Sequence, residues 1–237
     1  MQQRKQSAPQ PRSKVYGALN PRYDVRNIMS RSAQTIRGRM ACGKAQGEAK
    51  IESWWESMFC LRAEANGDLL WFETHPCRFE FEIAGQPSKY TPDAAVGHRQ
   101  YGTCLIEVKR QADIARPDTL VRLTGIRRHV EPLGFRLLYS TDRELRRPEE
   151  NARIRVVKIQ RCMYTMRETE SFAGRLAGYQ MLTIGEATAI LGRRNAVLHL
   201  LAKQHFFVDY RHPLTSNAII ARNPLEASHA VTLFSPW

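Results

Sequence analysis

Three residues whose side chains can do chemistry stand near the middle of the 237-residue chain. Asp93 ends a Tyr-Thr-Pro-Asp tetrapeptide, and Glu107 and Lys109 are two residues apart in the segment TCLIEVKR. Mg²⁺ prefers one or two protein carboxylates and keeps several waters, so the two acids are suitable ligands. Bound Mg²⁺ neutralises phosphate and activates water, and a lysine beside it can orient that water or offset developing charge. The pattern therefore indicates hydrolysis of a phosphodiester bond.

Three strands are predicted to position these side chains, joined by the short turns AGQPSK and GHRQYG as an antiparallel meander. The predicted strands are CRFEFEI (77–83), which alternates strictly, YTPDAAV (90–96) and TCLIEVKR (103–110). Residues two apart on a strand face the same way, so Glu107 and Lys109 share a face. We expect them to converge with Asp93 at one end of the sheet.

Helical spacing predicts a helix before the meander, from Glu52 to about Asn66, and a second one in PDTLVRLTGIRRHVEPLG after it. FRLLYST (135–141) predicts a strand, and the following segment should be largely helical with a break at Pro148. Glu56 in the first helix is an acid that could complete the site. The order is helix, three strands, helix, strand, helix, which is an α/β fold.

The sequence changes character after about Ser171. Thr183-x-x-Glu186 is a capping-box pattern, and the helix that it opens ends at Gly192. A second helix, NAVLHLLAKQ, precedes two β-rich runs around a Pro-Leu-Thr-Ser-Asn turn. Two helices followed by a hairpin predict a small winged-helix-like domain.

The formal net charge of +13 makes nucleic acid the expected partner. It is uneven: residues 1–50 carry +9, residues 51–170 carry +1 and residues 171–237 carry +3. Residues 1–25 are rich in Gln, Pro, Ser and basic residues, which predicts a flexible basic arm.

No run approaches 18 apolar residues and no apolar stretch follows the first charges, so we expect neither a membrane span nor a secretory signal. The five cysteines show no C-x-x-C spacing, which argues against a disulfide framework and a structural zinc site. Both observations predict a cytoplasmic protein.

A plain structural interpretation of the three residues stays open. Glu107 and Lys109 would then form a solvated charge stripe, and Pro92-Asp93 would start a turn. The chain contains incomplete copies of the pattern: Glu48-Ala49-Lys50 lacks an upstream Pro-Asp, and no acidic-x-Lys follows Pro117-Asp118. Since Asp, Glu and Lys are poor strand residues, their joint placement in consecutive strands favours a site.

The order of elements and motifs resembles the restriction-endonuclease-like PD-(D/E)xK nuclease core. From RNIMSRS through WWES, FETHP, YTPDAAV and LIEVKR to FRLLYSTDREL, roughly residues 25–165, the chain resembles the TnsA family of transposon-end endonucleases, and its C-terminal part is similar to the TnsA C-terminal domain. The resemblance implies a catalytic set of Glu56, Asp93 and Lys109. Glu107 would be an additional acid on the metal side.

The same resemblance implies Mg²⁺ held by Glu56, Asp93 and Glu107, with Mn²⁺ able to substitute. Two positions depart from the family pattern. His75-Pro76 stands where Gln-Pro is usual, and Cys60 replaces an acid often found four residues after Glu56. The fallback acids on the first helix are Glu52 and Glu64.

TnsA proteins cut the 5′ strands of double-stranded DNA at transposon ends, while a TnsB-like transposase cuts and joins the 3′ strands. A TnsC-like AAA+ regulator contacts the C-terminal region. The resemblance thus implies a bacterial cytoplasmic protein, bound to the nucleoid when on DNA. Its expected parts are the arm (1–25), an endonuclease domain (26–168) and a winged-helix-like domain for partner docking (171–237).

Two other functions stay open. One is a stand-alone restriction or repair endonuclease of the same fold, which would cut DNA unassisted in the presence of Mg²⁺. The other is a catalytically silent DNA-binding adaptor, whose acidic cluster would be structural only.

Overall fold

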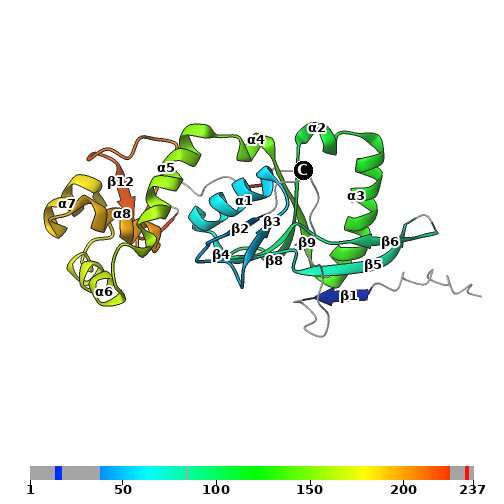
Figure 1. The fold of residues 1–237 in the computed structure, drawn as a ribbon, viewed down its shortest axis with the longest axis horizontal. Helices are drawn as coiled ribbons and strands as arrows, with labels where there is room; N and C mark the ends of the chain where they lie inside the picture. Colours follow the sequence, from blue (N-terminus) through cyan, green and yellow to red (C-terminus); the bar gives the residue numbers. More distant parts are fainter. Residues whose placement is uncertain (1–13, 18–37, 84, 225–232, 235–237) are drawn as a thin grey trace, which may run out of the picture.

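The computed structural model describes residues 14–17, 38–83, 85–224 and 233–234 of a mixed α/β protein (Figure 1). Its central sheet has the strand order β4-β7-β8-β9. These strands are β4 (Leu69–Thr74), β7 (Ala94–His98), β8 (Gly102–Lys109) and β9 (Arg136–Thr141). β7 runs antiparallel to both of its neighbours, β4 and β8, whereas β9 is parallel to β8 because the chain crosses over through a helix between them.

Each face of the central sheet is covered by different elements. Helix α1 (Trp54–Ala65) packs on one face, while α3 (Pro117–Val130), β5 (Cys77–Ile83) and β6 (Gln86–Tyr90) cover the other (Figure 1). Side chains alternate between the two cores along each strand. Ala94, Val96, Cys104 and Ile106 lie in the α1 core, and Ala95, Leu105, Leu137 and Tyr139 lie in the α3 core. The sheet is therefore buried on both sides.

The predicted meander is wrong in one member. β5 pairs not with β7 but with β1 (Lys14–Gly17) and β6, and β4 takes the expected place beside β7. The sequence pattern missed β4 because its burial does not alternate: its register shifts between Leu69 and Trp71, and Leu70 is exposed. The segment expected as the turn AGQPSK contains most of β6.

β1 also corrects the expected arm, because residues 14–17 form a strand instead of belonging to a flexible segment. The rest of the stretch 1–25 lies outside the described residues. Two further short strands, β2 (Gly38–Met40) and β3 (Ala49–Ile51), pair with each other beside α1.

The C-terminal part combines helices with a small sheet of order β10-β12-β11. Its elements are α6 (Met166–Arg175), β10 (Met181–Thr183), α7 (Ile184–Leu191), α8 (Arg194–Ala202), β11 (Phe207–Val208) and β12 (Ile219–Ala221). The capping box of Thr183 and Glu186 and the left-handed Gly192 that ends α7 (φ 76°) are confirmed. A second capping box, Thr165 with Glu168, opens α6, so the expected boundary at residues 168–171 falls inside a helix.

The remaining helices are α2 (Gln111–Ile114), α4 (Asp142–Leu145) and α5 (Pro148–Lys158), with 3₁₀ turns at Glu131–Leu133 and Ile159–Cys162. α4 and α5 confirm the helical segment with its break at Pro148. Within the described part of the chain, no helix has both the length and the apolar character needed to cross a bilayer.

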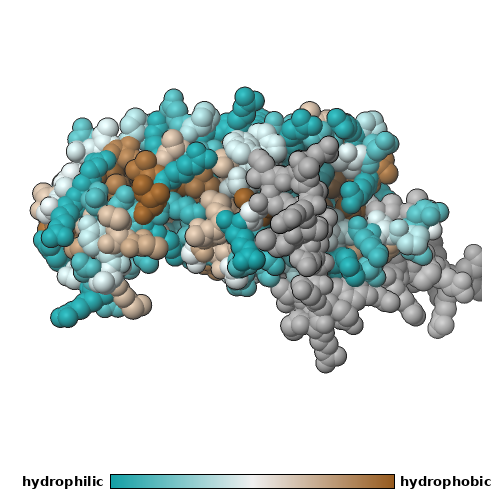
Figure 2. Space-filling model, viewed as in Figure 1, coloured by the Kyte–Doolittle hydropathy of each residue, from teal (hydrophilic) through white to brown (hydrophobic). Residues whose placement is uncertain are grey.

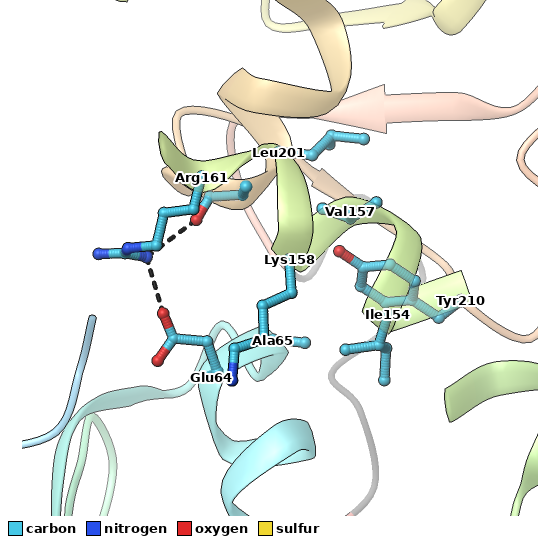
Figure 3. A pocket seen from close by; sticks show the side chains of 9 residues that line it. Glu64, Ala65, Ile154, Val157, Lys158, Arg161, Leu201 and Tyr210 are labelled. Carbon is cyan, nitrogen blue, oxygen red and sulfur yellow. Dashed lines mark hydrogen bonds and ion pairs between the residues drawn. The ribbon is translucent and has the colours of Figure 1, made fainter. Parts of the chain in front are cut away.

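Arg161 joins the C-terminal part to α1 beside a small cavity (Figure 3). One guanidinium nitrogen donates hydrogen bonds to Glu64 Oε1 (2.7 Å) and to the carbonyl of Ala202 (3.0 Å). The carboxylate of Glu64 also accepts from the backbone N–H groups of Gly43 and Lys44. The far end of α1 is therefore tied to both α8 and the segment before β3.

Candidate active site

Asp93, Glu107 and Lys109 lie at the same end of the central sheet. Asp93 immediately precedes β7, and Glu107 and Lys109 end the antiparallel strand β8, in which Ile106 pairs with Ala94. The alternation along the strands places all three residues on the α3 face. Asp93 stands one residue before the strand in which the sequence pattern placed it. The predicted convergence of the three residues is thus present.

Glu107 and Lys109 form an ion pair. Lys109 Nζ lies 2.5 Å from Glu107 Oε1, and the Glu107 side chain is only 7% exposed, so this carboxylate is not part of a solvated stripe. Burial by itself would lower the pKa of Lys109, but the nearby Glu107 and Asp93 outweigh burial and raise it. Lys109 therefore stays protonated at neutral pH.

Asp93 is held by the backbone of the neighbouring strand. Its Oδ2 accepts a hydrogen bond from the Val108 N–H at 2.7 Å. Desolvation, followed by the charges of Glu107 and Glu56, raises the pKa of Asp93 well above its usual range, although the Val108 N–H and Lys109 act in the opposite direction. Crowded carboxylates that repel one another are typical of sites that receive a cation or share a proton.

Glu56 reaches the site from the helix that covers the opposite face. It lies in the first turn of α1, where Ser53 is the N-cap and accepts from the Glu56 N–H. The Glu56 carboxylate accepts from the Ser53 hydroxyl and from the Glu52 N–H, both at 2.8 Å. Glu56 therefore caps the helix and also stands near Asp93, whose pKa it raises.

The two fallback acids differ in position. Glu64 lies two turns further along α1, and its carboxylate binds Gly43, Lys44 and Arg161, so it belongs to the junction with the C-terminal part. Glu52 precedes the helix, and its backbone N–H supports Glu56.

Two residues beside the site were not singled out for it from the sequence. Tyr90 is buried, and burial together with the charges of Glu107 and Asp93 raises its pKa well above the usual value. His75 lies within 3.6 Å of the Glu56 carboxylate and bonds to the backbone of Asp93. The sequence pattern carries no local signal for either residue. The local signal beside the site is that of the α1 helix cap, since Ser53-x-x-Glu56 matches the capping-box spacing.

The site offers carboxylate oxygens, which are the type of ligand that a hard divalent cation prefers. The residues that the structure describes include no group of three or more His, Cys, Asp or Glu side chains arranged to hold a metal ion. Mg²⁺ needs fewer, since one or two carboxylates and retained waters complete its shell. Asp93 and Glu107 supply two carboxylates, and the raised pKa of Asp93 shows negative charge that a cation would offset.

No known protein-family model matches the chain, and a search of curated proteins finds no significantly similar sequence.

Proposed function

We propose that this protein is a metal-dependent DNA endonuclease that cuts the 5′ strands at transposon ends, as its resemblance to the TnsA family implies. The observation that carries the proposal is the convergence of Asp93, Glu107 and Lys109 at one end of β7 and β8. Two carboxylates can hold Mg²⁺ for phosphodiester hydrolysis, and a protonated lysine can stabilise the charge that develops on the phosphate.

The topology supports a restriction-endonuclease-like core. A helix carrying Glu56 precedes an antiparallel trio of strands, and a crossover helix then leads to a parallel fourth strand. We propose that α1, the four-stranded sheet and α3 are this core, and that the C-terminal helices and small sheet are a winged-helix-like domain. The nuclease site then lies at the edge of the sheet where β7 begins and β8 ends.

The charged residues have distinct roles in the proposed reaction. Asp93 and Glu107 would hold Mg²⁺, with Glu56 beside them, and Mg²⁺ when bound supplies positive charge for the phosphate and acidity for water. Lys109 is protonated because Glu107 raises its pKa, so it acts as a cation towards the scissile phosphate and not as a base. The N–H of Val108 holds the carboxylate of Asp93 against β8, the strand that carries this lysine.

The surface of the C-terminal part carries exposed apolar residues that suit a protein partner. The apolar residues Tyr179, Met181 and Ile219 are exposed in the C-terminal part. In Figure 2, brown residues gather around the place of β12. Met181 and Ile219 share one face of the small sheet, since residues 181 and 183 pair with residues 221 and 219. An exposed apolar patch is typical of a protein-docking surface. We propose that it docks a TnsC-like regulator, while a TnsB-like transposase cuts the 3′ strands.

A strand-mapping experiment tests the proposal. A transposon-end duplex labelled on each strand is incubated with Mg²⁺ and the protein, with and without the neighbouring transposase. We expect 5′-strand cuts only in the assembled complex, and none with Asp93→Ala or Lys109→Ala, although both variants still assemble.

The other outcomes separate the alternatives. Full cleavage by either variant rejects the assigned site, and robust cutting of plasmid by the purified chain favours a stand-alone nuclease. Absence of cutting by the wild-type complex, with DNA binding that is unaffected by Asp93→Ala, indicates an adaptor. Asp118→Ala is the matched control, because Asp118 is the exposed acid of the other Pro-Asp pair.

A further inference from the structure

A strained two-residue connection lies between β4 and β5. β4 ends at Thr74 and β5 begins at Cys77, so His75 and Pro76 make the whole link. His75 has a φ of 50°, in the left-handed region that residues other than glycine rarely adopt. Among the described residues, Gln204 is the one other non-glycine residue with positive φ. Such strain persists where the surrounding structure holds the residue firmly, and it gathers at functional sites.

His75 contacts both acids that come from different sides of the sheet. Its backbone N–H donates to the carbonyl of Asp93 at 3.0 Å. Its ring Nε2 lies 3.6 Å from Glu56 Oε2, and its side chain is only 4% exposed. The other contacts given above for the Glu56 carboxylate come from residues 52 and 53, which are local to the start of α1. His75 therefore links the helix acid to the sheet acid.

The side chain matters in addition to the backbone. Glycine has no steric penalty in this conformation, and asparagine, aspartate and histidine adopt it more often than other residues do. Histidine bears the strain and also directs a buried ring at Glu56. The ring is thus in place to fix the Glu56 carboxylate beside Asp93.

We infer that His75 is a positioning residue that sets the placement of Glu56 relative to Asp93. This inference rests on the nuclease function proposed above. Without the imidazole, Glu56 keeps its contacts with Ser53 and Glu52 but loses the contact with the His75 ring. Metal binding and turnover should then weaken while the fold and DNA binding persist.

The test compares His75→Leu, which removes the polar ring, with His75→Gln, which keeps a side-chain N–H donor. Two quantities are measured: the affinity of the purified chain for Mn²⁺ without DNA, by electron paramagnetic resonance, and kcat and KM for 5′-strand cleavage by the assembled complex. We expect His75→Leu to lower both Mn²⁺ affinity and kcat at least about tenfold, as loss of a residue that supports a metal ligand does. KM for DNA should stay within about twofold, and His75→Gln should recover most of both losses.

His129→Leu is the control, because His129 is a half-buried histidine that stacks on Phe81 away from the site, and it should retain wild-type Mn²⁺ affinity and kcat. Wild-type Mn²⁺ affinity and kcat in His75→Leu would overturn the inference, as would a His75→Gln variant no better than His75→Leu. If His75→Leu does not fold, His75→Asn replaces it, since asparagine tolerates the backbone but has a shorter side chain, and the same losses are expected. Retained cleavage by Asp93→Asn would instead reject the assigned site, and absence of cleavage by the wild-type complex would reject the proposed nuclease function.

Discussion

The carboxylate of Asp93 accepts a hydrogen bond from the backbone N–H of Val108, with 2.7 Å between oxygen and nitrogen. Val108 stands between Glu107 and Lys109 on β8, and its own side chain lies in the core on the α1 side. The bond fixes Asp93 between an acid that repels it and a lysine that attracts it. The candidate site is therefore held together by the strand backbone even though its acids repel one another.

Asp93→Asn should stabilise the metal-free protein. Because the pKa of Asp93 is raised in the folded state, the charged form is disfavoured by folding: the penalty is present above the folded pKa and absent below the unfolded value near 3.9. Asparagine keeps an acceptor for Val108 and removes the charge. We expect a gain of about 1 kcal/mol, seen as ~2–4 °C in Tm at pH 8 with EDTA, that shrinks as the pH falls. Asp118→Asn should leave Tm unchanged, and a lower Tm for Asp93→Asn would contradict the prediction.

Arg62→Leu should strongly destabilise the protein. Arg62 lies fully buried on α1 and donates to Glu150 Oε1 and Asn151 Oδ1 on α5, both at 2.9 Å. Its removal takes away the closer of the two ion-pair partners that the buried Glu150 carboxylate has among the described residues, and Arg147 remains at 3.8 Å. We expect a loss of about 3–5 kcal/mol in the free energy of unfolding, measured with urea. The double variant Arg62→Leu/Glu150→Leu should recover part of it, and a double variant as unstable as the single one would show that the unpaired charge is not the cause.

Three of the candidate site residues that the sequence predicted are joined by local geometry. Asp93, Glu107 and Lys109 lie on two strands connected by a tight turn, so spacing and alternation were enough to bring them together. His75 was recognised only as a departure from a family pattern. Its contacts with Glu56 and Asp93 depend on how β4 lies beside β7 and on how α1 packs against the sheet, and neither long-range relationship has a local signature.

The same difference between local and long-range relationships applies to the fold. The strict alternation of 77–83 predicted β5 with its bounds, because one side of that strand faces a core and the other is polar. Its partner strands could not be predicted, since an alternating strand fits any sheet with one apolar face. β1 was hidden in a stretch whose composition is typical of a flexible arm, and pairing with β5 overrides that composition.

Lys44 should make stability depend on pH. Its ammonium donates to the carbonyl of Asn66, and burial, partly offset by Glu64, lowers its pKa to about 7. Between pH 7 and about 10.4 the unfolded chain then binds more protons at this residue than the folded one, so its contribution to stability rises with pH. The difference in unfolding free energy between wild type and Lys44→Met should therefore rise by up to about 1.4 kcal/mol per pH unit from pH 7 to 9. Urea titrations at several pH values measure it; Lys203→Met, at an exposed lysine, should show no such slope, and a flat difference for Lys44→Met would refute the prediction.

Deleting residues 1–13 should make DNA binding less sensitive to salt. Most of the excess positive charge lies before residue 51 (+9 of +13), while residues 51–170, which contain the candidate site, are nearly neutral. The N-terminal region is therefore the main source of cations for phosphate contacts. The deletion removes Arg4, Lys5 and Arg12 but retains β1, whose pairing with β5 a deletion of residues 1–25 would destroy.

Each lost phosphate contact lowers the log–log slope of affinity against salt by about 0.9, so the slope should become shallower by up to about 2.7. Fluorescence anisotropy with a duplex between 50 and 200 mM salt, roughly the range over which such effects are large, measures the slope. An unchanged slope would assign these three cations to a protein partner and leave DNA binding to Arg and Lys residues of the folded part.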